Sequence, residues 1–109
     1  MSLDRLARNQ ALFREVNERL LELAEGYQDG SMEFVCECSQ PDCTSTIVMD
    51  RADYEAVRRE PTSFVIAPGH EILEVEEVIT QHDGWMIVQK VTARDYAVET
   101  DPRRQDARS

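Results

Sequence analysis

The segment FVCECSQPDC, residues 34–43, holds the signals that decide the fold. Apolar and polar side chains alternate from Met32 to Cys36, which predicts a strand. Pro41-Asp42 is typical of a tight turn, and the β-branched run TSTIVM at 44–49 predicts a second strand. The segment therefore predicts a strand–turn–strand unit.

Three cysteines fall within this unit at the spacing C-x-C-x4-C. Side chains two residues apart on a strand point to the same face, so we expect Cys36 and Cys38 to project together. The intervening turn can bring Cys43 beside them. Three thiolates and one histidine form a common tetrahedral Zn²⁺ site. The spacing therefore predicts a zinc site that lacks only its fourth ligand.

The chain has two histidines that could supply this ligand. His70 follows Pro68-Gly69, a turn that would fix its ring at the end of a buried strand, whereas His82 precedes a predicted hairpin tip. We therefore predict His70 as the fourth ligand and His82 as an ordinary surface residue. Four protein ligands leave no open position for water, so the predicted zinc is structural. The small domain size agrees, because metal binding coupled to folding adds stability that a small core lacks.

Other interpretations of the cysteines are open. They could be small buried apolar residues without a metal, although their acidic and amide neighbours suit a dry core poorly. An iron–sulfur cluster generally takes four thiolates, and only three cysteines are present. A Cys36–Cys38 disulfide would close a strained short loop.

Residues 1–26 carry the clearest helical pattern, with Ser2 as the predicted N-cap and Gly26 as the stop. Three heptads are too few for a coiled coil, so we expect the helix to pack on the protein's own sheet, with a homodimer as the alternative. Its apolar side chains form one seam at helical spacing: Leu6, Phe13, Val16, Leu20 and Leu23.

Residues 32–100 predict a small zinc-stabilised α+β domain with a mostly antiparallel sheet. A helix capped by Asp50 is predicted over 51–59 and a buried strand over 63–67. Asp83-Gly84 predicts a hairpin with arms at 74–81 and 85–91, although the glutamates of residues 71–82 leave a helix open there. The last elements are a short helix over 92–99 and a disordered tail over 101–109.

The chain has 109 residues and a formal net charge of −10, which disfavours binding to nucleic acid or an anionic membrane. No Lys or Arg occurs between Arg59 and Lys90, so the acidic segment 71–83 is either a solvated face or a docking surface for a basic partner. Neither a transmembrane stretch nor a signal peptide is apparent, so we expect a cytoplasmic protein with reduced cysteines.

The chain resembles a family of small, largely uncharacterised bacterial proteins. The resemblance extends over most of residues 5–91 and lies in NQALFREVNERL at 9–20, the CEC-x4-C knuckle at 36–43, Y-x-x-V-R-x-x-P at 54–61 and PGHE at 68–71. It implies that Cys36, Cys38, Cys43 and His70 belong to one zinc-knuckle-like site, and it implies no activity.

These observations predict a non-enzymatic, zinc-binding protein that acts as a protein–protein interaction or regulatory adaptor. Its protein partner would contact the N-terminal helix, whose polar border would carry Arg8, Arg14 and Arg19, or the acidic segment 71–83. One alternative is a thiol-based redox or zinc sensor, in which cysteine oxidation releases the metal. A further alternative is a small metallo-hydrolase, which needs an open zinc position beside a carboxylate such as Glu71.

Overall fold

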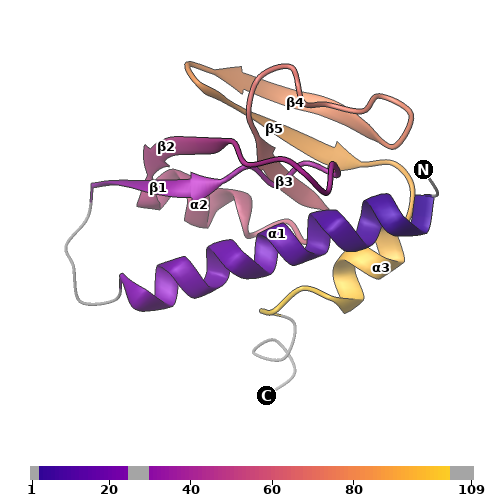
Figure 1. The fold of residues 1–109 in the computed structure, drawn as a ribbon. Coiled ribbons are helices and arrows are strands. Elements are labelled where there is room, and N and C mark those ends of the chain that lie inside the picture. The colour runs from indigo at the N-terminus through magenta and orange to yellow at the C-terminus, as the bar shows by residue number, and fades with distance from the viewer. Residues whose placement is uncertain (1–2, 25–29, 104–109) are drawn as a thin grey trace.

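The computed structural model describes residues 3–24 and 30–103, which form three helices and five strands (Figure 1). This is the predicted α+β class, with the cysteine-bearing segment in the sheet region. In chain order the elements are α1 Leu3–Leu23, β1 Ser31–Val35, β2 Thr46–Asp50, α2 Arg51–Val57, β3 Ser63–Ile66, β4 Glu76–His82, β5 Trp85–Lys90 and α3 Arg94–Glu99.

The strands form two small antiparallel sheets. One contains β1 and β2, and the other has the order β3-β5-β4. The predicted hairpin is confirmed, because β4 and β5 pair around Asp83-Gly84 and Gly84 adopts a φ of 89° that favours glycine. The ambiguous segment 71–82 is therefore a strand from Glu76 onward, preceded by a turn.

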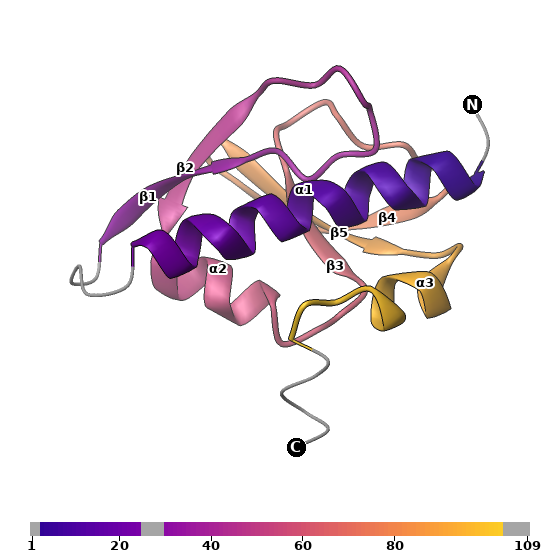
Figure 2. The ribbon, with the colours of Figure 1, turned by 60° about the horizontal axis from the view of Figure 1, so that its bottom comes forward.

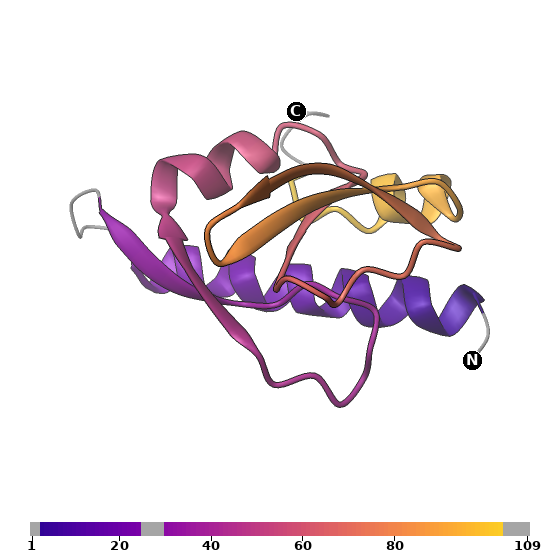
Figure 3. The same ribbon diagram turned by 90° about the horizontal axis from the view of Figure 1, so that it is seen from above.

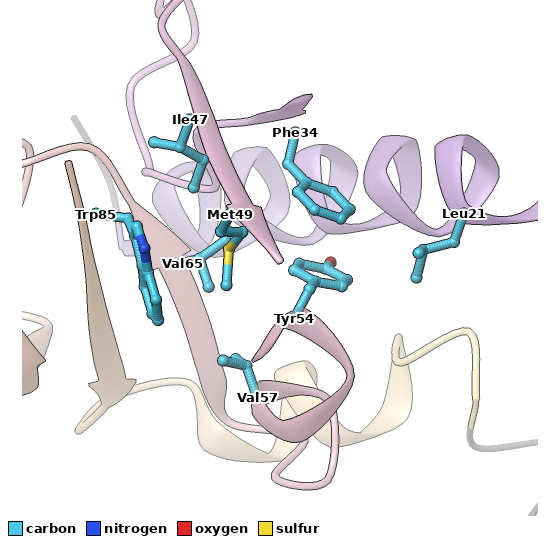
Figure 4. Close-up of a cluster of buried hydrophobic side chains, with 8 residues drawn as sticks. All are labelled: Leu21, Phe34, Ile47, Met49, Tyr54, Val57, Val65 and Trp85. Atoms are coloured by element: carbon cyan, nitrogen blue, oxygen red, sulfur yellow. The ribbon is translucent and has the colours of Figure 1, made fainter. Parts of the chain in front are cut away.

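A hydrophobic core joins both sheets to α1 and α2 (Figure 4). The rings of Phe34 and Tyr54 stack within it, with centroids 4.4 Å apart. Since Leu21 of α1 belongs to this cluster, the N-terminal helix shares a core with the rest of the described chain. The members are Leu21, Phe34, Ile47, Met49, Tyr54, Val57, Val65 and Trp85.

Helix α1 crosses the full width of the fold (Figures 1 and 2), and the face that it buries includes polar side chains beside apolar ones such as Leu6 and Leu21. Gln10, Arg14 and Asn17 are all 0% exposed. The predicted apolar seam is wrong in part, because Val16 is 37% and Leu23 is 78% exposed. The physical reason is that α1 lies against main-chain groups of other segments, which need hydrogen-bond partners when they are buried.

Arg14 is the clearest example of a polar side chain of α1 that bonds to buried main-chain groups. Its predicted place on the polar border of the helix is wrong. Its guanidinium donates hydrogen bonds to the carbonyl oxygens of Pro61 (2.6 Å) and Ala97 (2.7 Å). It also lies over the ring of Phe64, 4.7 Å from the centroid. Burial lowers its pKa. Arg14 thus ties α1 to the segment before β3 and to α3.

The structure also differs from the sequence predictions at the start of α2 and in the C-terminal tail. Asp50 stands at the N-cap of α2, but its side chain accepts a hydrogen bond from Ser31 (3.1 Å) and caps no helix N–H. In the predicted tail 101–109, Asp101 is buried and Arg103 binds Glu18, so residues 101–103 are packed because ion pairs hold them. Ser2, Gly26 and residues 104–109 lie outside the described residues.

Candidate metal centre

Two connections meet at the cysteine cluster: residues 36–45, which join β1 to β2, and residues 67–75, which join β3 to β4 (Figure 3). The first carries Cys36, Cys38 and Cys43, and the second carries His70. One ligand atom from each of the four lies within 4.8 Å of all the others. These four residues therefore lie together as the sequence pattern predicted, and they could hold a metal ion.

The second histidine lies elsewhere. His82 is at the end of β4, where its ring stacks on Trp85 with centroids 3.9 Å apart. It is exposed, as expected of a surface residue. Among residues 3–24 and 30–103, the Cys36–His70 cluster is the one group of histidine, cysteine or acidic side chains with metal-binding spacing.

Two distances within the cluster are compatible with a tetrahedral metal site. The His70 Nδ1 atom lies 3.6 Å from the Cys36 Sγ atom and 3.5 Å from the Cys43 Sγ atom. Zinc bonds of about 2.3 Å to sulfur and about 2.0 Å to nitrogen place the two ligand atoms of a tetrahedron about 3.5 Å apart. These two distances are therefore compatible with a metal ion held between the side chains, with Nδ1 of His70 near both sulfur atoms.

Backbone hydrogen bonds fix the segments that carry these ligands. The Cys36 N–H donates to Ser45 (3.0 Å) and extends the β1–β2 pairing beyond the regular strands. A turn brings the chain back at the third cysteine, where the Cys43 N–H donates to Gln40 (3.2 Å). The His70 N–H donates to Ala67 (3.2 Å), which closes the turn predicted at Pro68-Gly69.

The surroundings of the cluster favour loss of the proton from one thiol, that of Cys38. The Ala67 N–H donates to the Cys36 sulfur at 3.1 Å, a bond that stabilises negative charge there. The pKa of Cys38 is lowered from 9.0 to about 5, because hydrogen bonds stabilise its thiolate against the opposing effect of burial. The pKa of Cys36 is raised, because it shares its proton with Cys38 and is buried. Thiolates are the form that binds metals.

Glu37, between the first two cysteines, points into the protein on the opposite side. Its carboxylate accepts hydrogen bonds from Asn17 (2.8 Å), the Val65 N–H (3.1 Å) and the Tyr54 hydroxyl. Burial raises its pKa, while these donors oppose the increase. The strand alternation that placed the cysteines together also predicts this orientation, but sequence reasoning did not assign the residue a role.

Helix α1 holds the cysteine-bearing segment along its length. Asn17 bonds to both the N–H (2.8 Å) and the C=O (2.9 Å) of Val35, as a neighbouring strand would. Gln10 donates to the carbonyl of Glu37 (2.9 Å), and Asn9 donates to the carbonyl of Ser39 (3.0 Å). The amide side chains of one helix therefore position residues 35–39, a role that a search for apolar periodicity could not find.

One side of the cysteine cluster is buried, and the other side is partly exposed to solvent. Cys36 and Cys38 are 2% and 0% exposed and pack against a second apolar cluster that includes Phe64 and Met86. Cys43 and His70 are half-buried. Burial alone also fits cysteines that act as apolar side chains, but the spacing of sulfur and imidazole matches a metal site.

No family model, curated protein or solved structure matches this chain. Within the described residues, no helix combines the length and the hydrophobicity that crossing a bilayer requires.

Proposed function

We propose that the chain is a non-enzymatic zinc-binding protein of the bacterial cytoplasm, a protein–protein interaction or regulatory adaptor whose structural zinc is bound by Cys36, Cys38, Cys43 and His70. The convergence of these four ligand atoms within 4.8 Å carries the proposal. Three soft thiolates and one imidazole at tetrahedral spacing suit Zn²⁺. An iron–sulfur cluster is less well matched, because it generally takes four thiolates.

A structural role follows from what the metal would connect. Residues 36–43 extend from the β1–β2 sheet, and His70 follows β3 of the other sheet. One ion would therefore cross-link two sheets whose strands are only four to seven residues long. Because a domain of this size has a small core, such a cross-link contributes a large share of its stability.

The hydrolase alternative has less support. Four protein ligands fill a tetrahedral shell, so no position is left for a zinc-bound water. Glu71 adjoins His70 in sequence, but a carboxylate activates water only where the metal has an open position.

The sensor alternative has one observation in its favour, the half-buried position of Cys43. Oxidants reach exposed thiolates first, and Cys43 is the most accessible of the three sulfurs. Cys36 and Cys38 are almost fully buried, which favours a metal that is retained.

The proposed partner is a protein. The net charge of −10 favours a basic one. A second copy of the chain is an alternative for the apolar side chains that α1 exposes, Leu12, Val16 and Leu23. Membership of the bacterial family with the CxC-x4-C…PGHE pattern is part of the same proposal.

Thermal unfolding with and without a strong chelator tests the structural role. We expect chelation to lower the Tm by more than about 10 °C, because several kcal/mol of coordination energy are lost. His82→Ala is the matched control and should respond as the native chain does. His70→Ala should start at a lower Tm and respond less. Identical melting curves with and without chelator would contradict the proposal.

A further inference from the structure

A groove of about 730 Å³ lies beside the metal cluster, between the start of α1, the loop that joins Cys38 to Cys43, and the turn before β4. We call it the knuckle groove. Its volume falls within the range of about 300–1,000 Å³ that is usual for ligand sites. Four apolar residues line it: Leu6, Pro41, Ile72 and Val75.

The charged residues of the knuckle groove are all acidic. Asp42 and Glu74 both line it and are exposed, and none of the basic side chains among residues 3–24 and 30–103 lines it. The sequence provides no Lys or Arg between Arg59 and Lys90, so the 72–75 wall carries no basic residue of its own. The groove therefore complements a ligand that combines an apolar group with a positive charge.

The wall that contains Pro41 and Asp42 depends on the metal. It belongs to the four residues between Cys38 and Cys43, so two proposed ligands anchor both of its ends. A hydrogen bond from Asn9 to the Ser39 carbonyl (3.0 Å) also attaches it to α1. The opposite wall begins two residues after His70, which the same ion would hold. A metal at the cluster thus fixes the distance between two walls of the groove.

We propose that the knuckle groove binds a short peptide segment of a partner protein in which an apolar side chain stands next to a Lys or Arg, and that the metal maintains this binding site. The proposal rests on the proposed function and names the surface and the partner chemistry. A peptide fits better than a small amine, because the walls come from three chain segments and the two carboxylates are on different ones. The exposed side chain of Leu73 (68%) adds apolar surface next to the groove.

Selection of random heptapeptides displayed on phage against the zinc-loaded protein tests this proposal. We expect the enriched peptides to combine Leu, Ile, Phe or Trp with an adjacent Lys or Arg. Synthetic versions are then titrated by fluorescence anisotropy. The double variant Asp42→Asn/Glu74→Gln should weaken their binding about fivefold, since each exposed charge pair contributes modestly. Glu60→Gln/Glu77→Gln changes the net charge equally, outside the groove, and should leave binding unchanged.

Two further comparisons separate the groove from general attraction to an acidic protein. Ile72→Gln should weaken binding, whereas Ile79→Gln, which changes an exposed isoleucine of β4, should not. Zinc removal should weaken peptide binding about tenfold, and by linkage the peptide should strengthen zinc retention by the same factor. Hexylamine should compete only weakly.

Several outcomes would overturn the proposal: no enriched sequence, enrichment of acidic peptides, equal losses in both double variants, or hexylamine binding as tightly as the peptides. Zinc content is measured on the same preparations. Stoichiometric zinc together with any of these outcomes refutes the groove and leaves the proposed function intact. A preparation without zinc refutes the proposed function as well.

Discussion

Replacement of Asn17 by alanine tests the polar helix face, the feature that departs most from the expected amphipathic seam. The amide of Asn17 bonds to both backbone groups of Val35 and to the carboxylate of Glu37, at 2.8–2.9 Å. Asn17→Ala removes all three bonds at a position that is 0% exposed. Each buried polar group left without a partner costs about 1–3 kcal/mol. Since the losses are coupled, we expect a total of about 3–4 kcal/mol.

Asn9→Ala is the matched control on the same helix. It makes the same chemical change but removes one bond, to the Ser39 carbonyl, at a half-buried position. We expect a loss of about 1 kcal/mol. A typical domain has only about 5–15 kcal/mol of stability, so the two variants should be clearly distinguishable.

Urea unfolding of the zinc-loaded proteins, followed by fluorescence, measures both losses. Trp85 is the chain's only tryptophan and lies in the main core at 8% exposure, so its emission reports global unfolding. If Asn17→Ala cost no more than Asn9→Ala, α1 would not position residues 35–39, and that part of the account would fail.

Three other perturbations test separate parts of the structure. Burial raises the pKa of Glu76 above 4.5. Ionisation of this carboxyl therefore stabilises the unfolded chain more than the folded one, and this effect begins where the carboxyl of the unfolded chain ionises, near pH 4.5. Glu76→Gln should therefore gain stability relative to the native chain as the pH rises through 4.5 and level off above the folded-state pKa; a stability difference that does not change with pH in urea unfolding would contradict this. Arg103→Ala should cost about 1 kcal/mol in the same assay, because it removes a bidentate ion pair to Glu18; an unchanged midpoint would mean that residues 101–103 are not held by this pair. Mild peroxide should release zinc slowly to a chromogenic chelator, because only Cys43 is accessible; rapid release that thiols reverse would favour the sensor instead.

The four candidate ligands were more predictable from the sequence than the side chains of α1 that position the cysteine-bearing segment. Cys36 and Cys38 are two residues apart in an extended segment, Cys43 follows a proline turn, and His70 follows a glycine turn, so local rules suffice to place each side chain. That His70 meets the cysteines depends on how two sheets pack, and sequence patterns suggest this only indirectly.

The side chains of α1 that position other segments were missed because their hydrogen bonds reach distant parts of the chain. Asn17, Gln10 and Arg14 each bond to backbone groups of distant segments, between 18 and 83 residues away. A periodicity search scores these side chains as solvent-facing, so it assigned the buried face to Val16 and Leu23. The strands were predicted more accurately than the buried face of α1, because β-branched runs and the Asp-Gly turn are local signals.

The metal content of the purified protein tests the central claim most directly. Elemental analysis of the native chain and of His70→Ala and His82→Ala variants should give one zinc per chain for the native protein and for His82→Ala, and clearly less for His70→Ala. Absence of zinc from the native protein, or full zinc content in His70→Ala, would contradict a Cys₃His site.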